Sequence, residues 1–542
     1  MIGLRDLRLP PVHSWADAYD QFQLPPVERY DIASDCLRGD AGRAAITEVL
    51  GNDVRTVTVG ELDRLSAGLA NGLVAHGLTA GDRVAIKLSQ SVDMAVAVFG
   101  VLRAGGVVLP LSNVLAEDGL RHRIGDAGPR TLIATGTDAE VALARDAGLT
   151  LITIDELPGT PNLSRLAQAG STQPPDRTHA AIDDPALLLY TSGTSGKPKG
   201  VLHSNQFLLG HHALDLAFDR VRDADVAYSP VDWAWGGGLM LGLLGPLAYG
   251  VPVVAFREPH FDPERAMQLM TALGVSIGLF PPTVLRMLRA SGALEAEAVG
   301  RSRLRCFITG AEAVEADLFA WAGSIGLGVN NAFGQTEANA LIGHARVLGT
   351  LDPAALGRPY PGHRVDVLDD DLQPVQRGEQ GQLAVAADDP ACMMGYWNAP
   401  EATAAKIRGG WLLTGDTAHR DDDGVLYFHG RSDDIIKSGA YRLGPAEIEA
   451  AIRKSPLVED CAVVGLPDAI RGEIVSAVVT LRPGATASSE LTTELRDLVR
   501  SSVGAHAYPR DVRYVDTLPK TTTGKVDRTT LRASLIAEGS PA

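Results

Sequence analysis

The sequence is poor in cysteine and in aromatic residues, and its few cysteines are widely scattered. Aromatic residues make up 5% of the 542 residues, and the four cysteines are Cys36, Cys306, Cys392 and Cys461. No two of them have the spacing of metal ligands, so a cysteine-based metal site is excluded. Each cysteine is therefore expected to be a small buried apolar residue in a reducing compartment.

The sequence also lacks a long uninterrupted apolar run and an excess of basic residues. The longest apolar stretch, Met94 to Leu111, contains Arg103 and glycines, so it predicts no transmembrane helix. The N-terminus carries Arg5, Asp6 and Arg8 instead of the apolar segment of a signal peptide. The formal net charge of −17 argues against a surface for nucleic acid or anionic membranes. These absences predict a cytoplasmic protein with no nucleic-acid partner and no membrane span.

What the sequence does contain is the pattern of an α/β protein with more than one domain. Hydrophobic residues make up 45% of the chain, and 542 residues exceed one ordinary core. Helical patterns at 62–78 and 92–102 alternate with short β-branched segments at 83–87 and 107–111. This alternation indicates parallel sheet flanked by helices. Residues 355–430 are rich in strands and turns, and a further α/β pattern follows them.

The most informative segment is a polar run that follows the apolar residues 186–189. It reads Thr191, Ser192, Gly193, Thr194, Ser195, Gly196, Lys197, Pro198, Lys199 and Gly200. Glycines let backbone N–H groups turn inward around an anion, hydroxyls donate further hydrogen bonds, and lysines add charge. The segment therefore predicts a polyphosphate-binding loop, with a solvated linker as the alternative. It is not a Walker A loop, because a proline follows Gly196-Lys197.

This loop resembles the phosphate-binding signature of the ANL adenylating superfamily, which joins acyl-CoA synthetases, peptide-synthetase adenylation domains and firefly luciferases. The similarity extends from about Tyr30 to Leu535. It implies an α/β fold with a large N-terminal domain, residues 1–432, of parallel-rich sheets flanked by helices plus a distorted β-barrel subdomain. Residues 433–542 would form a small mobile α+β domain. Asp433 would be the hinge between two half-reactions, although an acidic turn residue would look the same.

The resemblance also implies an ATP site with Mg²⁺. Glu337 matches the family's magnesium-associated glutamate, and Thr336 matches its α-phosphate contact. Asp416 matches the carboxylate that accepts hydrogen bonds from the ribose hydroxyls, and Arg431 matches a second ribose contact. Glu312 and Ala313 match the segment that lines the adenine, with Phe333 on its other side. The other implied nucleotide contacts are Asn331, Ala332, Gly334 and Gln335. Without the motif context, any of these charged residues would be an ordinary surface group.

The reaction and its catalytic residues follow from the same resemblance. Lys525, in a glycine-containing loop, would bridge the carboxylate and the α-phosphate during adenylation, and Arg442 would contact the α-phosphate. A small-molecule carboxylic acid and ATP would give an acyl-adenylate and pyrophosphate. The acyl group would then pass to CoA, leaving AMP. The oligomeric state stays open, a homodimer included.

A second group of positions matches the CoA contacts of medium-chain acyl-CoA synthetases. These positions are Gly439, Ala440, Tyr441, Arg471, Tyr508, Pro509 and Arg510. Basic groups suit the phosphates of CoA, whereas the alternative, an acyl-AMP ligase that loads a carrier protein, would not need them. Family members commonly have glycine where this chain has Ala440, so a methyl group could narrow the pantetheine tunnel there.

The segment from Tyr228 to Gly238 matches the lining of the family's acyl site. The implied pocket residues are Trp235, Gly236, Gly237, Gly310 and Gly334. Acetate-specific relatives have tryptophan where this chain has Gly334 and larger residues where it has Gly236 and Gly237. The missing side chains predict a medium-chain, branched or aromatic acid rather than acetate, unless the glycines serve a tight turn.

Other members of the superfamily supply further alternatives. Asp232 could be the amino-group anchor of an amino-acid adenylation domain, but its Asp-Trp-Ala-Trp context is similar to acyl-CoA synthetases. A luciferase-like oxygenase shares the fold, and no sequence feature favours it. A non-catalytic relative would be expected to lack Lys525 or Glu337, and both are present.

Overall fold

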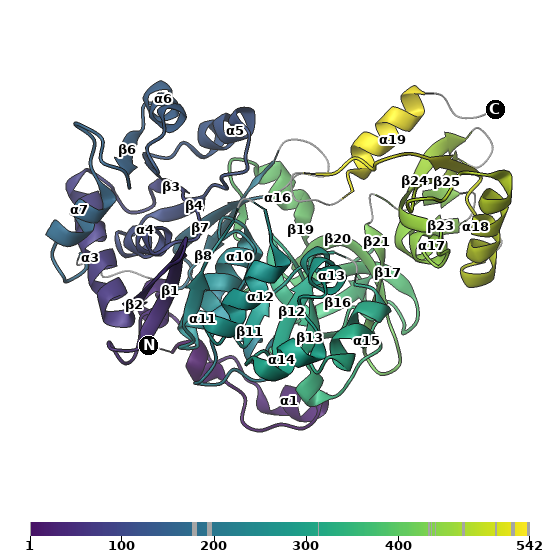
Figure 1. Ribbon diagram of the computed structural model, residues 1–542, viewed down its shortest axis with the longest axis horizontal. Helices are drawn as coiled ribbons and strands as arrows, with labels where there is room; N and C mark the ends of the chain where they lie inside the picture. The colour runs from purple at the N-terminus through teal and green to yellow at the C-terminus, as the bar shows by residue number, and fades with distance from the viewer. Residues whose placement is uncertain are drawn as a thin grey trace. The chain divides into compact units, whose positions relative to one another are not determined.

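The structure is a computed structural model, and its described residues fall into two compact units (Figure 1). It describes residues 2–175, 181–191, 198–258, 260–312, 314–431, 434, 436–438, 441–468, 472–504, 507–521 and 526–538. Unit 1 comprises Met1–Thr191, Lys199–Val365 and Val385–Leu412, and unit 2 comprises Ser192–Pro198, Asp366–Ala384 and Leu413–Ala542. The domain boundary at Asp433 stays a prediction, because that residue lies outside the described residues.

The first sheet of unit 1 contains the predicted parallel core. Its order is β18 (Gly395–Tyr396), β8 (Gly200–Ser204), β7 (Pro185–Tyr190), β4 (Val107–Pro110), β3 (Arg83–Lys87), β5 (Thr131–Ala134) and β6 (Thr150–Thr153). The strands from β7 to β6 pair in parallel, whereas β8 is antiparallel to both of its neighbours. The predicted helices are α3 (Val59–Ala75) and α4 (Val92–Arg103). Helix α3 begins earlier than predicted because Thr58 Oγ1 accepts the Glu61 N–H and caps it.

The strand after the polar run distinguishes this loop from a Walker A loop. Strand β7 continues into the antiparallel strand β8, with Tyr190 opposite Gly200. The Thr191 N–H donates to the Lys199 carbonyl at 3.0 Å, which closes the pair beyond the last strand residues. The predicted phosphate loop therefore connects the two strands of a β-hairpin. A Walker A loop would instead lead into a helix.

The second sheet of unit 1 is also mainly parallel. Its order is β15 (Arg358–Pro359), β14 (Ala338–Gly343), β13 (Gly328–Gln335), β12 (Cys306–Gly310), β11 (Ile277–Leu279), β9 (Ala227–Tyr228), β10 (Val253–Ala255), β1 (Ala44–Leu50) and β2 (Asp53–Thr58). The pairs from β13 to β1 are parallel, and β14, β15 and β2 add antiparallel edges.

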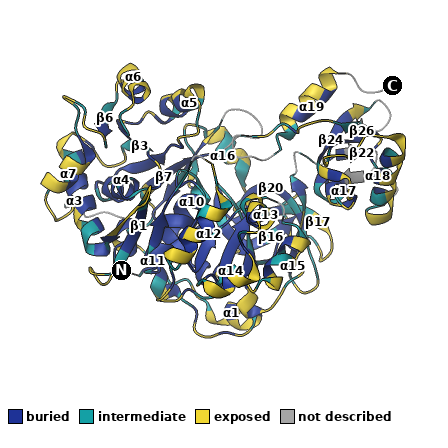
Figure 2. Ribbon diagram, in the orientation of Figure 1, coloured by how far each residue is buried: buried dark blue, intermediate teal, exposed yellow. Residues whose placement is uncertain are grey.

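Helices pack around both sheets of unit 1. Beyond α3 and α4 they are α1 (Trp15–Gln21), α2 (Ile32–Cys36), α5 (Glu117–Ala127), α6 (Asp138–Asp146), α7 (Leu163–Ala169), α8 (Gln206–Leu209), α9 (Leu214–Ala217), α10 (Gly236–Leu239), α11 (Gly245–Ala248), α12 (Pro263–Ala272), α13 (Pro282–Ser291), α14 (Ala296–Arg301), α15 (Ala316–Ser324) and α16 (Pro400–Lys406). A π-helical segment, Met240–Leu244, joins α10 directly to α11. Short 3₁₀ helices are Leu4–Leu7 and Arg346–Leu348. Figure 2 shows buried strands, with exposed residues on the outer faces of helices such as α5, α6 and α7.

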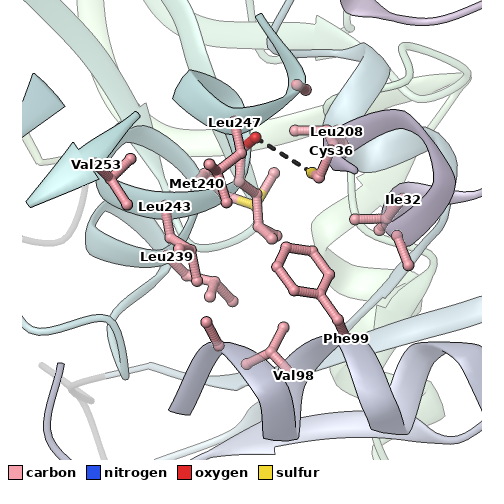
Figure 3. Packing of buried hydrophobic residues seen from close by; sticks show 14 of the residues in the cluster. Ile32, Cys36, Val98, Phe99, Leu208, Leu239, Met240, Leu243, Leu247 and Val253 are labelled. Carbon is pink, nitrogen blue, oxygen red and sulfur yellow. Dashed lines mark hydrogen bonds between the residues drawn. The ribbon is translucent and has the colours of Figure 1, made fainter. Parts of the chain in front are cut away.

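One part of the core of unit 1 lies where α2, α4 and the segment from α10 to α11 meet (Figure 3). Phe99 is fully buried there, and burial of such a side chain stabilises the fold by about 1.5–3 kcal/mol. The Cys36 thiol donates a hydrogen bond to the Leu244 carbonyl at 3.3 Å, and burial raises the pKa of that thiol. All four cysteines are free and buried, as predicted.

The strand-rich region predicted at 355–430 forms a third sheet. It has the order β16 (Val365–Leu368), β17 (Gln380–Ala386), β20 (Trp411–Arg420) and β19 (Ile407–Arg408), and β21 (Leu426–Arg431) also pairs with β20. The pairs of β20 with β19 and β21 are antiparallel.

The C-terminal part of unit 2 is a small α+β structure. Its sheet has the order β23 (Tyr441–Leu443), β22 (Ile436–Ser438), β25 (Gly472–Leu481) and β24 (Val458–Asp468), and β26 (Asp511–Tyr514) pairs with β25. The helices are α17 (Pro445–Ile452), α18 (Ser489–Ser502) and α19 (Arg528–Ala537). The predicted fold class is therefore confirmed. Among the described residues, no helix has the length and apolar character needed to cross a membrane.

Candidate active site

The end of strand β13 leaves the core and carries the motif that the sequence analysis singled out. Residues 328–330 are buried, whereas residues 331–336 are only partly buried. The pairing register of β13 with β14 shifts between Phe333 and Gln335, so that Gly334 lies opposite a bulge formed by residues 339–341 of β14. Bulges bend a strand and redirect its side chains, and they are frequent beside active sites. Thr336 and Glu337 follow directly in the turn to β14.

Glu337 is held by groups from the first sheet. Its side chain is largely buried, and its Oε1 accepts a hydrogen bond from the Tyr396 hydroxyl at 2.6 Å. Its backbone carbonyl accepts the Met393 N–H at 2.8 Å. The preceding carbonyl, of Thr336, accepts a hydrogen bond from His203 Nε2 at 2.7 Å. The motif at the end of β13 is therefore fixed to strands β8 and β18.

Burial sets the charge of the His203 ring, and its contact with Thr336 sets the tautomer. Burial lowers the pKa of His203 to about 3, so the imidazole is neutral at pH 7. A neutral ring that donates through Nε2 carries its hydrogen on that nitrogen. The other ring nitrogen, Nδ1, is buried and has no hydrogen-bond partner among the described residues.

Lys199 lies beside this arrangement at the start of β8. Its ammonium is 5.4 Å from the centre of the Tyr396 ring, within the range of a cation–π contact. Its backbone N–H donates to Thr191 Oγ1 at 3.3 Å. Thr191 and Lys199 are thus joined across the hairpin, while the predicted loop residues Ser192, Gly193, Thr194, Ser195, Gly196 and Lys197 lie outside the described residues.

The described residues fit a magnesium ion that is shared with nucleotide phosphates. Glu337 Oε1 is engaged by Tyr396, and Oε2 accepts no hydrogen bond from the residues that the structure describes. Mg²⁺ commonly takes one or two carboxylates together with phosphate oxygens and water. Within the described ranges no three His, Cys, Asp or Glu side chains cluster to hold a metal. Any Mg²⁺ here would therefore depend on the phosphates as well as on Glu337.

The segment predicted to line the adenine follows strand β12 with unusual backbone angles. Gly310 has φ 156°, and Ala311 has φ 67° in the left-handed region that residues with a Cβ rarely adopt. Glu312 accepts the Thr283 hydroxyl at 2.8 Å and lies 3.5 Å from Arg286. Strain of this kind, held by the surrounding structure, is common at binding sites.

The remaining predicted nucleotide contacts lie on β13 or beyond the described residues. Asn331 Nδ2 donates to the Leu356 carbonyl at 3.5 Å, and Ala332 and Phe333 are partly buried. Ala313 lies outside the described residues.

The predicted ribose contacts face each other across two strands of unit 2. Asp416 on β20 is the register partner of Arg431 on β21. Asp416 is 3% exposed, and Arg431 Nε lies 3.5 Å from its Oδ1. The Asp416 N–H donates to Thr414 Oγ1 at 3.0 Å. A carboxylate in this position can accept hydrogen bonds from hydroxyl groups.

Much of the remaining predicted machinery of unit 2 lies outside the described residues. This applies to Asp433, Gly439, Ala440, Arg471 and Lys525. Tyr441 and Arg442 are described in their backbone only, on β23, where Arg442 pairs with Lys437 and Tyr441 with Ser438.

The Tyr508-Pro509-Arg510 triplet forms a basic cluster in unit 2. The guanidinium of Arg500 lies 4.2 Å from the centre of the Tyr508 ring, and that of Arg510 lies 5.1 Å from it. Arg496 donates to the Pro509 and Arg510 carbonyls at 2.9 and 2.8 Å. The ring therefore orders two cations, which is compatible with the predicted role in binding phosphate.

The structure argues against an amino-acid anchor at Asp232. This carboxylate is buried and forms an ion pair with Arg257. Its Oδ2 also accepts the Ser112 hydroxyl at 2.5 Å, and its Oδ1 accepts the Ala234 N–H at 3.0 Å. Both oxygens are thus engaged within the protein. Asp232 supports the turn before α10, and the amino-acid interpretation loses its main residue.

The predicted pocket glycines differ in whether the surrounding backbone requires glycine at their positions. Trp235, Gly236 and Gly237 are partly buried at the start of α10, and neither glycine has a positive φ. A Cβ on Gly237 would lie 3.6 Å from Leu279 Cδ2, and one on Gly236 would lie 3.3 Å from Leu189 Cδ1. No tight turn requires these two glycines.

Backbone atoms explain the other two glycines. A Cβ on Gly334 would lie 2.4 Å from the Ala340 backbone nitrogen, and one on Gly310 would lie 2.1 Å from the Ala332 carbonyl oxygen. The bulge and the close strand pairing therefore demand glycine at both positions. In this backbone Gly334 says less about the size of an acid pocket than Gly236 and Gly237 do.

Sequence reasoning missed Tyr396 and His203, the two side chains that hold the Glu337 motif. Tyr396 stands in a Gly-Tyr-Trp-Asn sequence, and His203 stands in a β-branched strand context. Neither carries a local chemical signal. The pairing of β18 with β8 places the two side chains in one sheet. The bridge between Ala338 and Cys392 and the hydrogen bond from Met393 to Glu337 join that region to residues 336 and 337.

Comparisons with known proteins agree with the fold and with these motifs. A family model described as AMP-binding enzyme matches residues 36–397, and one described as AMP-binding enzyme C-terminal domain matches residues 447–525. YtcI of Bacillus subtilis (strain 168), named an uncharacterized acyl-CoA ligase, is 30% identical over 479 residues, covering 87% of this chain and 88% of its own. An acetyl-coenzyme A synthetase of Pyrobaculum arsenaticum is 31% identical over 502 residues, covering 86% and 74%.

A solved structure extends the likeness to three dimensions. ATP-bound MatB from Rhodopseudomonas palustris superposes with a TM-score of 0.84 at 30% sequence identity, covering 94% of this chain and 99% of that protein. The resemblance to adenylating enzymes that the motifs indicated is confirmed.

Proposed function

This chain belongs to the AMP-binding enzyme family and is an AMP-forming acid–thiol ligase, and from that premise we propose a two-step reaction on a medium-chain, branched or aromatic acid. In the first step the carboxylate attacks the α-phosphorus of ATP and displaces pyrophosphate. In the second step the thiol of CoA attacks the acyl carbon and AMP leaves. The family supports the use of ATP and CoA, and the order of steps and the choice of acid are the proposal.

In the proposed adenylation, the hairpin loop and Glu337 bind the two ends of the triphosphate. Backbone N–H groups and hydroxyls of residues 191–196 would cradle the β- and γ-phosphates, with Lys197 and Lys199 supplying positive charge. Glu337 would hold Mg²⁺, which neutralises charge on the phosphates when bound. Thr336 would donate its hydroxyl to the α-phosphate. Asp416 and Arg431 would bind the ribose, and Glu312 and Ala313 would line the adenine with Phe333 on its other side.

Residues 433–542, the predicted C-terminal domain, would supply the side chains that act on the reacting phosphate. Lys525 and Arg442 would bind the α-phosphate as negative charge accumulates on it, a form of electrostatic stabilisation. Asp433 would serve as the hinge that exchanges Lys525 for the CoA-binding residues between the steps. In the second step Tyr508, Pro509 and Arg510, with Gly439, Ala440, Tyr441 and Arg471, would bind CoA. The Tyr508 cluster supports this part, because two ordered guanidinium groups suit phosphate.

The proposed acid class depends on the start of helix α10. Gly236 and Gly237 are helical, partly buried and free of a backbone requirement for glycine. Their lack of side chains leaves room beside Trp235 that a larger acid can fill. Each additional methylene buried there would strengthen binding by about 0.8 kcal/mol. The relatives that match this chain include one named an acyl-CoA ligase and one named an acetyl-coenzyme A synthetase, so their names do not determine the acid. The proposed acid class therefore depends on the two glycines.

The observation that carries the proposed adenylation is the largely buried Glu337 carboxylate, held 2.6 Å from Tyr396 beside Lys199 of the hairpin. The test is isotope exchange between labelled pyrophosphate and ATP with Mg²⁺ and a panel of acids from acetate to decanoate, with branched acids and benzoate. Exchange without CoA, and acyl-CoA formation once CoA is added, is the expected result. A Glu337→Gln variant should lose the exchange.

Three outcomes would change the proposal. No exchange with any acid would overturn adenylation. A preference for acetate would overturn the acid class alone. Exchange that leads to a product only with a carrier protein, and never with CoA, would overturn the second step.

A further inference from the structure

Tyr396 lies between the two charged side chains that the proposed site requires from unit 1. Its hydroxyl donates to Glu337 Oε1 at 2.6 Å, and its ring centre is 5.4 Å from the Lys199 ammonium. The three side chains come from strand β18, the turn after β13 and the start of β8. A single residue thus contacts both the proposed metal ligand and a proposed phosphate ligand.

The backbone of Tyr396 is fixed from two directions. Its N–H donates to Thr403 Oγ1 at 2.8 Å, and Tyr396 pairs with Val201 across β18 and β8. The next residue, Trp397, donates its N–H to the Gly200 carbonyl at 2.7 Å. The ring therefore projects from a rigid base, which is the condition for one side chain to position another.

The backbone around Glu337 is fixed as well, and this leaves the carboxylate direction as the main freedom. Met393 donates to the Glu337 carbonyl, and His203 donates to the Thr336 carbonyl. Of the described groups, the Tyr396 hydroxyl is the donor to the carboxylate itself. A hydrogen bond to an ionised acceptor is shorter and stronger than a neutral one, and 2.6 Å is typical of it.

We propose that Tyr396 is a positioning residue that orients Glu337 for Mg²⁺ and restrains Lys199 beside the same phosphates. The hydroxyl occupies Oε1, so Oε2 is the oxygen left for the metal. The aromatic face attracts the Lys199 ammonium and limits where it can lie. This inference rests on the proposed function, because it concerns the metal and phosphates of the adenylation step.

Two substitutions separate the two contacts. Tyr396→Phe removes the hydroxyl and keeps the ring, whereas Tyr396→Leu removes both. Loss of a group that orients a metal ligand typically lowers metal affinity by about 10–100-fold. Tyr396→Phe should therefore raise the Mg²⁺ concentration for half-maximal exchange at least tenfold, with kcat restored by excess Mg²⁺. Tyr396→Leu should in addition raise the KM for ATP about two- to fivefold, because that factor corresponds to the free energy of an exposed cation–π contact.

The measurement that does not depend on turnover is Mn²⁺ binding, followed by electron paramagnetic resonance with ATP present and no acid. The Mn²⁺ affinity of Tyr396→Phe should fall by a factor similar to the shift in Mg²⁺ dependence. Tyr19→Phe is the matched control, because Tyr19 is 40% exposed and its hydroxyl donates to the Pro359 carbonyl at 2.7 Å. That variant should bind Mn²⁺ like the wild type.

The outcomes distinguish this inference from the function on which it rests. Wild-type Mn²⁺ affinity in Tyr396→Phe would overturn the role toward Glu337, even if the variant were less stable to heat. Equal KM values for ATP in the Phe and Leu variants would overturn the role toward Lys199. If the wild-type protein fails to exchange pyrophosphate with every acid in the panel, the proposed function is overturned, and this inference is overturned with it.

Discussion

The two glycines at the start of helix α10 allow acid selectivity to be tested with a single methyl group. In Gly237→Ala the new Cβ would lie 3.6 Å from Leu279 Cδ2, an ordinary van der Waals distance. Alanine is also favoured over glycine within a helix by about 1 kcal/mol. The substitution should therefore leave the fold intact or slightly more stable, and any change in activity would report on the space beside the residue.

The size of the effect follows from the volume that the methyl group removes. If Gly237 lines the acid site, the methyl group displaces about one methylene of the bound acid, which is worth about 0.8 kcal/mol. Since about 1.4 kcal/mol corresponds to a factor of ten, the longest accepted acid should lose about fourfold in kcat/KM. The optimum should move about one carbon toward shorter chains, and acetate should be unaffected because it does not reach the site.

The assay is pyrophosphate exchange over a series of straight-chain acids, with thermal unfolding of each variant as the measure of stability. Gly334→Ala is the matched control, because its Cβ would lie 2.4 Å from the backbone nitrogen of Ala340 and the backbone cannot yield easily. It should destabilise the protein by about 1–3 kcal/mol. An unchanged chain-length profile in a stable Gly237→Ala variant would refute the assignment of this glycine to the acid site.

Three further predictions concern other parts of the protein. Lys525→Ala should abolish acyl-adenylate formation but retain thioester formation from a supplied acyl-adenylate; equal loss of both steps in stopped assays would refute the assignment. Ala440→Gly should speed the thioester step if the methyl group narrows the CoA tunnel, and an unchanged single-turnover rate would show that it does not. Burial lowers the pKa of His203 to about 3, so its neutral form stabilises the fold fully above pH 6.5, and this contribution falls as the pH drops and the unfolded chain takes up a proton. Between pH 6.5 and 5 the loss should be about 1.5 kcal/mol, and a His203→Phe variant whose pH dependence of unfolding equals that of the wild type would contradict it.

The parts of the fold that depend on local patterns could be predicted from the sequence. The strand at Arg83–Lys87 was placed correctly because its β-branched residues are flanked by polar ones. Helix α17 begins at Pro445, because proline suits the first turn of a helix. Motifs read as a set predicted the family, which the comparisons confirm.

Contacts between distant segments could not be predicted in this way. Tyr396 reaches Glu337 across 59 residues of sequence, and the bridge between Ala338 and Cys392 with the Met393–Glu337 hydrogen bond brings the two segments together. Asp232 was a candidate amino-group anchor from the sequence, and its ion pair with Arg257, a residue of a later segment, argues against that role. Gly334 looked like an absent pocket side chain, whereas a strand bulge that depends on Ala340 explains it.

The π-helical segment Met240–Leu244 has a consequence for how such a protein can change its substrate during evolution. A π turn holds one residue more than an α turn, and each helical residue turns the chain by about 100°. Removing one residue from 240–244 would restore regular α-helix and rotate Gly236 and Gly237 relative to the anchored residues of α11. A single-codon deletion would thus turn Trp235, Gly236 and Gly237 together toward different neighbours, so a change of length here could alter acid choice without any substitution at these positions.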